Sequence, residues 1–144
     1  MLTVACVLSK GPKYNDEHVD RLRGQVRPHL NQPYNFVCLD DSPFPGWWAK
    51  ISLFEPGRFE GRVLYLDLDV EVTGNLDDIA DHPFPFAIIK DWGRFGYNSS
   101  VMTWDAGSVD HVFTDFRPGV AAQLPGDQDW ITQKVPDAAI LPRS

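Results

Sequence analysis

The sequence begins with a continuous apolar run, Leu2 to Ser9, in which polar and apolar residues do not alternate. A run of this kind indicates a strand that is buried on both faces, as in the parallel sheets of α/β proteins. Similar short runs recur at 34–39, 62–66, 86–89 and 101–104. Because helical patterns lie between them, we predict a single α/β domain with helices packed on a mainly parallel sheet.

The first helix is the clearest of those that we predict between the strands. Asn15 can cap it, and Val19, Leu22 and Val26 recur at steps of three or four residues. Further helices are expected from Trp47 to the Pro56-Gly57 stop, over 76–80, over 108–116 and from Asp127 onward, with a loop at 118–126 and a short apolar segment at 138–141.

Length and charge limit the class of protein. A chain of 144 residues with 43% hydrophobic residues is enough for one domain with one core. The net charge of −7 disfavours a nucleic-acid partner, so an anionic ligand would need a metal ion or a few well-placed cations.

The apolar start is too short for a signal peptide or a membrane span, and Cys6 and Cys38 lack metal-ligand spacing. We therefore expect a cytoplasmic protein with buried thiols and no transmembrane segment.

Two carboxylates follow the third apolar run, in the sequence Asp67-Leu68-Asp69. On an extended chain, residues two apart point to the same face, with Cα atoms about 6.5–7 Å apart. Two carboxylates arranged in this way suit a hard divalent cation such as Mg²⁺ or Mn²⁺, whose remaining positions are open to water or phosphate oxygens.

Two alternatives remain open for this pair. Asp residues commonly end a strand and solvate a turn without any further role. Haloacid-dehalogenase-like phosphatases also place an Asp nucleophile and an Asp acid/base two apart after an apolar strand. Val70 fits that pattern, but a complete β-α-β-α unit precedes the motif here, whereas in those phosphatases it usually lies near the start of the fold.

Four segments together resemble retaining glycosyltransferases of family 8, the glycogenin-like and lipopolysaccharide-galactosyltransferase-like group with the GT-A fold. The segment Val63 to Ile79 resembles the family's core motif. Three others follow the family's order: Trp48 to Phe54 its lysine helix, Tyr97 to Met102 its Asn-Ser-Gly-Val motif, and Gly126 to Asp129 its Gly-Asp-Gln motif. The resemblance covers most of the chain and implies a nucleotide-diphospho-sugar transferase domain with a Rossmann-like sheet.

The resemblance implies roles for the residues around the acidic pair. Asp67 and Asp69 would bind the Mn²⁺ or Mg²⁺ that bridges the diphosphate of a UDP-sugar, and Lys50 would stabilise the charge of the departing diphosphate. The other donor-binding positions that match are Val7, Leu8 and Tyr14 for the uracil, Leu68 within the core motif, and Asp91, Asn98 and Ser99 for the sugar hydroxyls. Lys50 could instead be a surface lysine, and Tyr14 a loop residue.

Asp127 and Gln128 match the pair that flanks the reacting carbon in the family. Asp127 would orient the donor or act as a transient nucleophile, and Gln128 would stabilise the oxocarbenium-like state. An N-cap role for Asp127 is the structural alternative. The sequence departs from the family at Ser100, where a glycine is usual.

The family's third metal ligand, a histidine in a C-terminal His-x-x-Gly-x-x-Lys-Pro-Trp motif, has no counterpart, because no histidine follows His111. We expect residues 1–144 to form a GT-A-like glycosyltransferase domain that lacks this motif. The implied activity is that of a hexosyltransferase: metal-dependent, retaining transfer of a hexose from a UDP-sugar to the hydroxyl of an unknown glycan or small-molecule acceptor. A phosphatase that uses Asp67 and Asp69, or a non-catalytic nucleotide-sugar-binding fragment, are the alternatives.

Overall fold

The computed structural model describes residues 1–9, 14–44, 46–90, 97–121 and 123–141. Its centre is one six-stranded sheet with the order β2-β1-β3-β5-β4-β6. The strands are β1 (Leu2–Val7), β2 (Tyr34–Leu39), β3 (Arg62–Leu66), β4 (Phe86–Lys90), β5 (Tyr97–Asp105) and β6 (Ala139–Leu141). Only β5 runs against its neighbours, so the prediction of an α/β domain with a mainly parallel sheet is confirmed.

β5 differs from the expected strand at 101–104. It is longer, and it lies antiparallel between β3 and β4, with Leu66 opposite Val101 and Phe86 opposite Trp104. This reversed strand places its amino end beside the carboxyl end of β3. Polar residues that start β5 therefore reach the same edge of the sheet as the acidic pair that follows β3.

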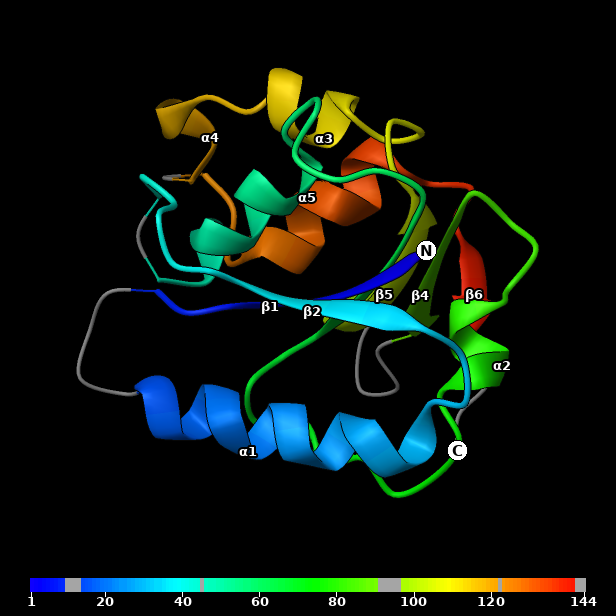
Figure 1. Ribbon diagram of the computed structural model, residues 1–144. Helices are drawn as coiled ribbons and strands as arrows, with labels where there is room; N and C mark the ends of the chain where they lie inside the picture. Colours follow the sequence, from blue (N-terminus) through cyan, green and yellow to red (C-terminus); the bar gives the residue numbers. More distant parts are fainter. Residues whose placement is uncertain (10–13, 45, 91–96, 122, 142–144) are drawn as a thin grey trace.

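Helices cover both faces of the sheet (Figure 1). One face carries α1 (Asp16–Val26), which is followed by the 3-10 turn η1 (Arg27–His29); α2 (Asp77–Ala80) packs against β3. The other face carries the 3-10 helix η2 (Gly46–Phe54) with α3 (His111–Thr114) and α5 (Asp127–Lys134). The short helix α4 (Pro118–Ala121) lies where a loop was expected, and α3 is shorter than the predicted helix at 108–116.

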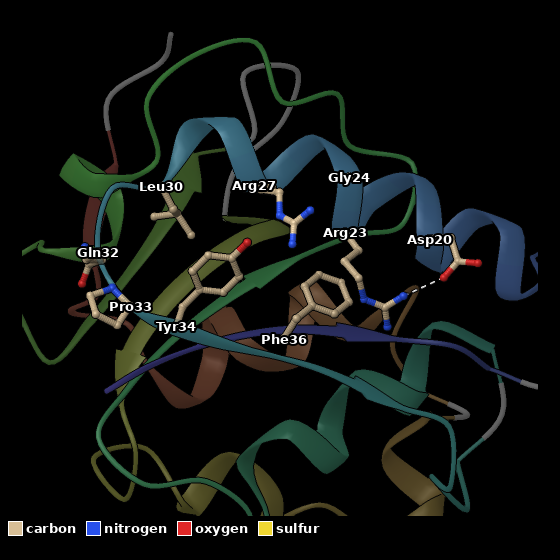
Figure 2. Close-up of a pocket in the computed structure, with 9 residues that line it drawn as sticks. All are labelled: Asp20, Arg23, Gly24, Arg27, Leu30, Gln32, Pro33, Tyr34 and Phe36. Carbon is tan, nitrogen blue, oxygen red and sulfur yellow. Dashed lines mark hydrogen bonds and ion pairs between the residues drawn. The ribbon is translucent and has the colours of Figure 1, made fainter.

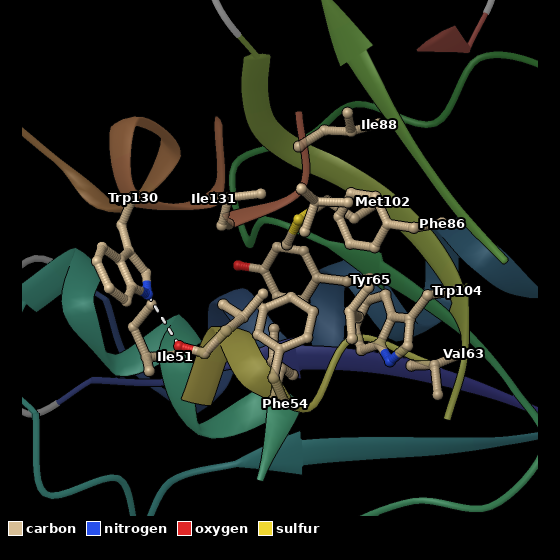
Figure 3. Close-up of a cluster of buried hydrophobic side chains, with 14 of the residues drawn as sticks. Ile51, Phe54, Val63, Tyr65, Phe86, Ile88, Met102, Trp104, Trp130 and Ile131 are labelled. Carbon is tan, nitrogen blue, oxygen red and sulfur yellow. Dashed lines mark hydrogen bonds between the residues drawn. The ribbon is translucent and has the colours of Figure 1, made fainter. Parts of the chain in front are cut away.

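Strand alternation divides the core into two layers. Leu64 and Leu66 of β3 face the α1 side, where α1 buries Val19 and Leu22 among others. Val63 and Tyr65 face the opposite layer, which is rich in aromatic rings. Figure 3 shows Tyr65 in this second layer, together with the buried rings Phe54, Phe86, Trp104 and Trp130.

The predicted cap of α1 is confirmed. The Asn15 side chain accepts a hydrogen bond from the Glu17 N–H at 2.9 Å, and the Asn15 N–H donates to Nδ1 of His18 at 3.1 Å. This reciprocal capping box satisfies N–H groups that the first helical turn leaves unpaired.

The helix predicted from Trp47 is present as η2, and it is a 3-10 helix rather than an α-helix. Its buried residues Trp48, Ile51 and Phe54 are spaced by three, which matches the three residues per turn of a 3-10 helix. Residues three apart lie above one another in a 3-10 helix, and Lys50 forms such a row with the buried Leu53, one turn further along. The stem of Lys50 is thereby directed along the core while its ammonium reaches the edge of the sheet.

Candidate active site

A polar pocket of about 260 Å³ opens at the carboxyl edge of β3. Its lining comes from η2, from the residues after β3, from the start of β5 and from α5: Lys50, Asp67, Asn98, Ser99, Ser100, Pro125, Gly126, Asp127, Gln128 and Asp129. Ligands of open α/β sheets bind at this kind of edge. Sequence reasoning had placed Lys50, Asp67, Asn98, Ser99, Asp127 and Gln128 in the site, and the structure brings all six to this pocket.

The ammonium of Lys50 is the centre of the pocket's charge. Its Nζ lies 2.9 Å from Oδ1 of Asp67 and 3.7 Å from Oδ2 of Asp127. The side chain of Lys50 is only 13% exposed, and that of Asp127 only 6%. A cation held between two carboxylates in a mostly buried position is strongly localised, because little water screens it.

Ser99 joins the two sides of this arrangement. Its Oγ accepts a hydrogen bond from Lys50 Nζ at 3.1 Å and donates one to Asp127 Oδ2 at 2.6 Å. Ser99 is buried at the start of β5, so it fixes the Asp127 carboxylate relative to the sheet. The resemblance had suggested a sugar contact for Ser99, whereas these hydrogen bonds give it a positioning role as well.

Tyr65 is a site residue that sequence reasoning missed. Its hydroxyl donates a short hydrogen bond to Oδ1 of Asp67, and Lys50 Nζ lies 5.6 Å from the centre of its ring. Burial raises the pKa of Tyr65 well above its ordinary value, and the negative charge of Asp67 adds to this effect. The signal was present in the sequence, because residues 65 and 67 are two apart and share one face where a strand ends.

Asp127 is the first residue of α5, and Gly126 occupies the N-cap position without a side-chain capping bond. The alternative of Asp127 as an N-cap is therefore wrong. Its carboxylate points to Ser99 and Lys50 instead. Burial raises the pKa of Asp127, and Asp67 adds to that effect, whereas Lys50 and the Ser99 hydrogen bond oppose it.

The acidic pair does not keep the extended geometry that the sequence suggested. β3 ends at Leu66, and the Val70 N–H donates to the Asp67 carbonyl at 3.1 Å, which closes a turn. Asp67 faces Lys50, whereas the exposed Asp69 accepts a hydrogen bond from the Tyr14 hydroxyl at 3.4 Å. Leu68 between them is buried.

The side chains of this turn have the chemistry that a divalent cation prefers. Both side chains are carboxylates, the ligands that Mg²⁺ and Mn²⁺ prefer. Among the described residues, no three His, Cys, Asp or Glu side chains gather into a group that could hold a metal ion. A cation at Asp67 and Asp69 would have further positions open to water or phosphate oxygens, as is usual for magnesium at phosphate-binding sites.

The three positions expected to bind the uracil, Val7, Leu8 and Tyr14, lie at the same edge of the sheet. Val7 ends β1, and the N–H of Leu8 donates to the Leu39 carbonyl at 2.8 Å. The half-buried ring of Tyr14 packs edge-on against His18, with ring centres 5.2 Å apart. Asp91, the remaining position predicted to bind the donor, lies outside the described residues.

A second cavity, of about 710 Å³, lies beside α1 and β2 (Figure 2). The Arg23 guanidinium stands 4.9 Å from the centre of the Phe36 ring, and Tyr34 lies nearby. Tyr34 opens β2, so this cavity is at the amino end of that strand. It is separate from the candidate active site, which lies at the carboxyl edge.

The fold is that of an α/β domain which is also found in glycosyltransferases of known structure. The chain is similar to the glycosyltransferase GlyE of Streptococcus pneumoniae TIGR4, with a TM-score of 0.73 and 16% identity over 96% of this chain and 44% of GlyE. The apo form of GlyE gives a TM-score of 0.69 at 16% identity, over 97% of this chain and 44% of GlyE.

A glycosyltransferase involved in glycosylation of the major capsid of PBCV-1 is also similar, with a TM-score of 0.62 and 15% identity over 98% of this chain and 80% of that protein. No family model and no curated protein matches the sequence. The structural likeness thus shows the fold, and the chain spans less than half the length of GlyE. Within the described residues, no helix has the length and apolar character needed to cross a membrane.

Proposed function

We propose that this domain is a hexosyltransferase that moves a hexose from a UDP-sugar to the hydroxyl of a glycan or small-molecule acceptor, with retention of configuration. One observation carries the proposal: the Lys50 ammonium is held between Asp67 and Asp127 in a pocket at the carboxyl edge of a glycosyltransferase fold. A buried, positioned cation at this edge suits a ligand that develops negative charge as it leaves.

The proposed donor lies along the edge from β1 to α5. Val7, Leu8 and Tyr14 hold the uracil, and Tyr14 stacks on it. Leu68 supports the turn beneath the diphosphate. The sugar hydroxyls contact Asn98 and Ser99 at the start of β5, together with Asp91.

Asp67 and Asp69 are the proposed ligands of Mn²⁺ or Mg²⁺. The bound ion would supply positive charge next to the diphosphate. Asp67 already contacts Lys50 and Tyr65, which fix its orientation, while the exposed Asp69 is open to solvent. Ligands held in this way suit a cation that arrives together with the donor.

In the transfer step, the bond from the sugar's anomeric carbon to the diphosphate oxygen breaks, and a bond to the acceptor oxygen forms. Lys50 stabilises the diphosphate as its charge grows. Asp127, fixed by Ser99, faces the sugar and stabilises the positive charge that develops at the anomeric carbon, and Gln128 lines the same pocket.

Binding of UDP, measured by isothermal titration calorimetry with Mn²⁺ and with EDTA, tests the donor and the metal together. We expect binding with Mn²⁺ that weakens at least several-fold in EDTA. Absence of UDP binding under both conditions would overturn the proposal. Metal-dependent UDP binding without turnover of any UDP-hexose would instead support a non-catalytic nucleotide-sugar-binding domain.

Asp127→Asn tests the catalytic assignment. The substitution keeps the size of the side chain and its hydrogen bond from Ser99, so we expect transfer or donor hydrolysis to fall roughly 100-fold or more while UDP still binds. Asp137→Asn, at an exposed position after α5, is the matched control and should leave activity unchanged.

The phosphatase alternative makes a different prediction. It would replace this proposal if the wild-type protein bound no UDP but hydrolysed p-nitrophenyl phosphate, and if Asp67→Asn abolished that hydrolysis.

A further inference from the structure

Cys6 and Cys38 lie side by side on the two parallel strands β1 and β2. They are direct partners in the register of the sheet. Both belong to the layer beneath α1, so their side chains leave the sheet on the same face. Neighbouring strands are about 4.8 Å apart, and disulfides join Cα atoms about 4.4–6.8 Å apart, so the backbone can hold a bond between the two sulfurs.

The two thiols differ in exposure and in acidity. Cys6 is fully buried, whereas Cys38 is half-buried. Interaction with the neighbouring Cys6 thiol lowers the pKa of Cys38, and the same neighbour relationship, together with burial, raises the pKa of Cys6. The nearby N–H of Leu8 also lowers the pKa of Cys38, whereas burial and the charges of Asp40 and Asp16 oppose the shift. Cys38 is therefore both the more accessible and the more nucleophilic sulfur.

We propose that Cys6 and Cys38 form a site of reversible oxidation, in which a peroxide joins β1 to β2 through a disulfide. The Cys38 thiolate attacks the peroxide, which breaks the O–O bond and gives a sulfenic acid on Cys38; with hydrogen peroxide, the other product is water after proton uptake. The Cys6 sulfur then attacks the Cys38 sulfur, displacing hydroxide, which leaves as water with the thiol proton. A dithiol reductant restores both thiols.

The position of this pair next to Leu8 links it to the edge of the sheet. The N–H of Leu8, which lowers the pKa of Cys38, donates its hydrogen bond to the carbonyl of Leu39, the last residue of β2. An effect of oxidation on donor binding would rest on the proposed function, whereas formation of the disulfide does not. The chemistry of the thiols is therefore tested without UDP or an acceptor.

The experiment uses the full, folded chain, whose only two cysteines are these. The reduced protein is treated with a small molar excess of hydrogen peroxide, quenched with catalase, then denatured and alkylated. We expect the two alkylatable thiols to disappear, the intact mass to fall by two hydrogen atoms, and the Cys6 and Cys38 peptides to be linked. Dithiothreitol should restore both thiols.

Single substitutions assign the order of the steps. In Cys6→Ala, the Cys38 sulfenic acid should persist and be captured by dimedone, whereas in Cys38→Ala the Cys6 thiol should remain alkylatable. Two thiols retained in the treated wild-type protein would overturn the proposal. Sulfinic acid on Cys38 beside an intact Cys6 thiol, or links between chains only, would overturn it equally.

Discussion

Lys50 and Asp67 meet at 2.9 Å although one lies on a 3-10 helix and the other follows a strand. The row of η2 that contains Lys50 also contains the buried Leu53, so the stem of the lysine runs along the core to the edge of the sheet. The pairing joins the helical layer to the carboxyl end of β3. The Lys50–Asp67 ion pair therefore belongs both to the candidate active site and to the contacts that hold η2 on the sheet.

Replacement of Lys50 by Met should therefore destabilise the fold as well as the site. Two carboxylates, Asp67 and Asp127, would lose their cation in a poorly hydrated pocket. Removing one partner of a buried ion pair lowers the free energy of unfolding by at least about 3 kcal/mol. We expect a loss of this size in the free energy of unfolding, measured with urea and circular dichroism.

Lys134→Met is the matched control for Lys50→Met. Lys134 pairs with Asp115 at 2.6 Å, but the two side chains are 25% and 48% exposed. A pair near the surface contributes about 1 kcal/mol or less. Equal losses in the two variants would contradict the view that Lys50 is a buried, central cation.

Asp127→Asn should change stability with a definite dependence on pH. Burial raises the folded-state pKa of Asp127, so as the pH rises above about 4 the unfolded chain loses its proton first. The ionised carboxyl then costs stability in the folded state. We expect Asp127→Asn to gain stability over the wild type as the pH rises from about 4 through the folded-state pKa of Asp127.

Asp77→Asn is expected to show the opposite dependence on pH. Hydrogen bonds from Gln32 and Asn31 lower the pKa of Asp77, so its contribution is fully present above about pH 4 and is lost as the pH falls through the folded-state pKa. The variant should be less stable than the wild type at neutral pH, and the difference should shrink in acid. Thermal melts across this range compare the two variants directly, and the same slope in both would refute the assignment.

Tyr65→Phe should isolate the contribution of the hydroxyl beside Asp67. The ring remains in the aromatic layer, while the hydrogen bond to a carboxylate is lost. Such a bond contributes about 2 kcal/mol, so the urea midpoint should fall accordingly. The half-buried Tyr34→Phe is a control for loss of a tyrosine hydroxyl and should change stability much less. A Tyr65→Phe protein as stable as the wild type would show that the hydroxyl adds nothing to the fold.

Asp69→Asn should separate binding from folding. Asp69 is exposed, so the free energy of unfolding should change by about 0.5 kcal/mol or less. As a proposed metal ligand, its loss should weaken Mn²⁺-dependent binding of UDP by about 10-fold or more, measured by calorimetry. Asp78→Asn, at another exposed carboxylate, should bind as the wild type does. Unchanged affinity in Asp69→Asn would remove Asp69 from the site.

Several local features could be predicted from the sequence because they depend on near neighbours. The apolar run before Asp67 predicted β3, and Asn15 with the repeat that begins at Val19 predicted α1. The helix that starts near Trp47 was also predicted, but not its 3-10 geometry, in which the buried Trp48, Ile51 and Phe54 are spaced by three. Each depends on the periodicity of a single element, which the order of residues contains directly.

The sequence by itself therefore determined the strands, the first helix and the placing of acidic residues at a strand end. Only the tertiary structure decided that β5 runs backwards between β3 and β4, because pairing between strands depends on hydrogen bonds between distant segments. That reversal brings Ser99 beside Lys50 and Asp127, residues separated from it by 49 and 28 positions. No local pattern encodes their meeting, since packing of the whole sheet against its helices sets these distances.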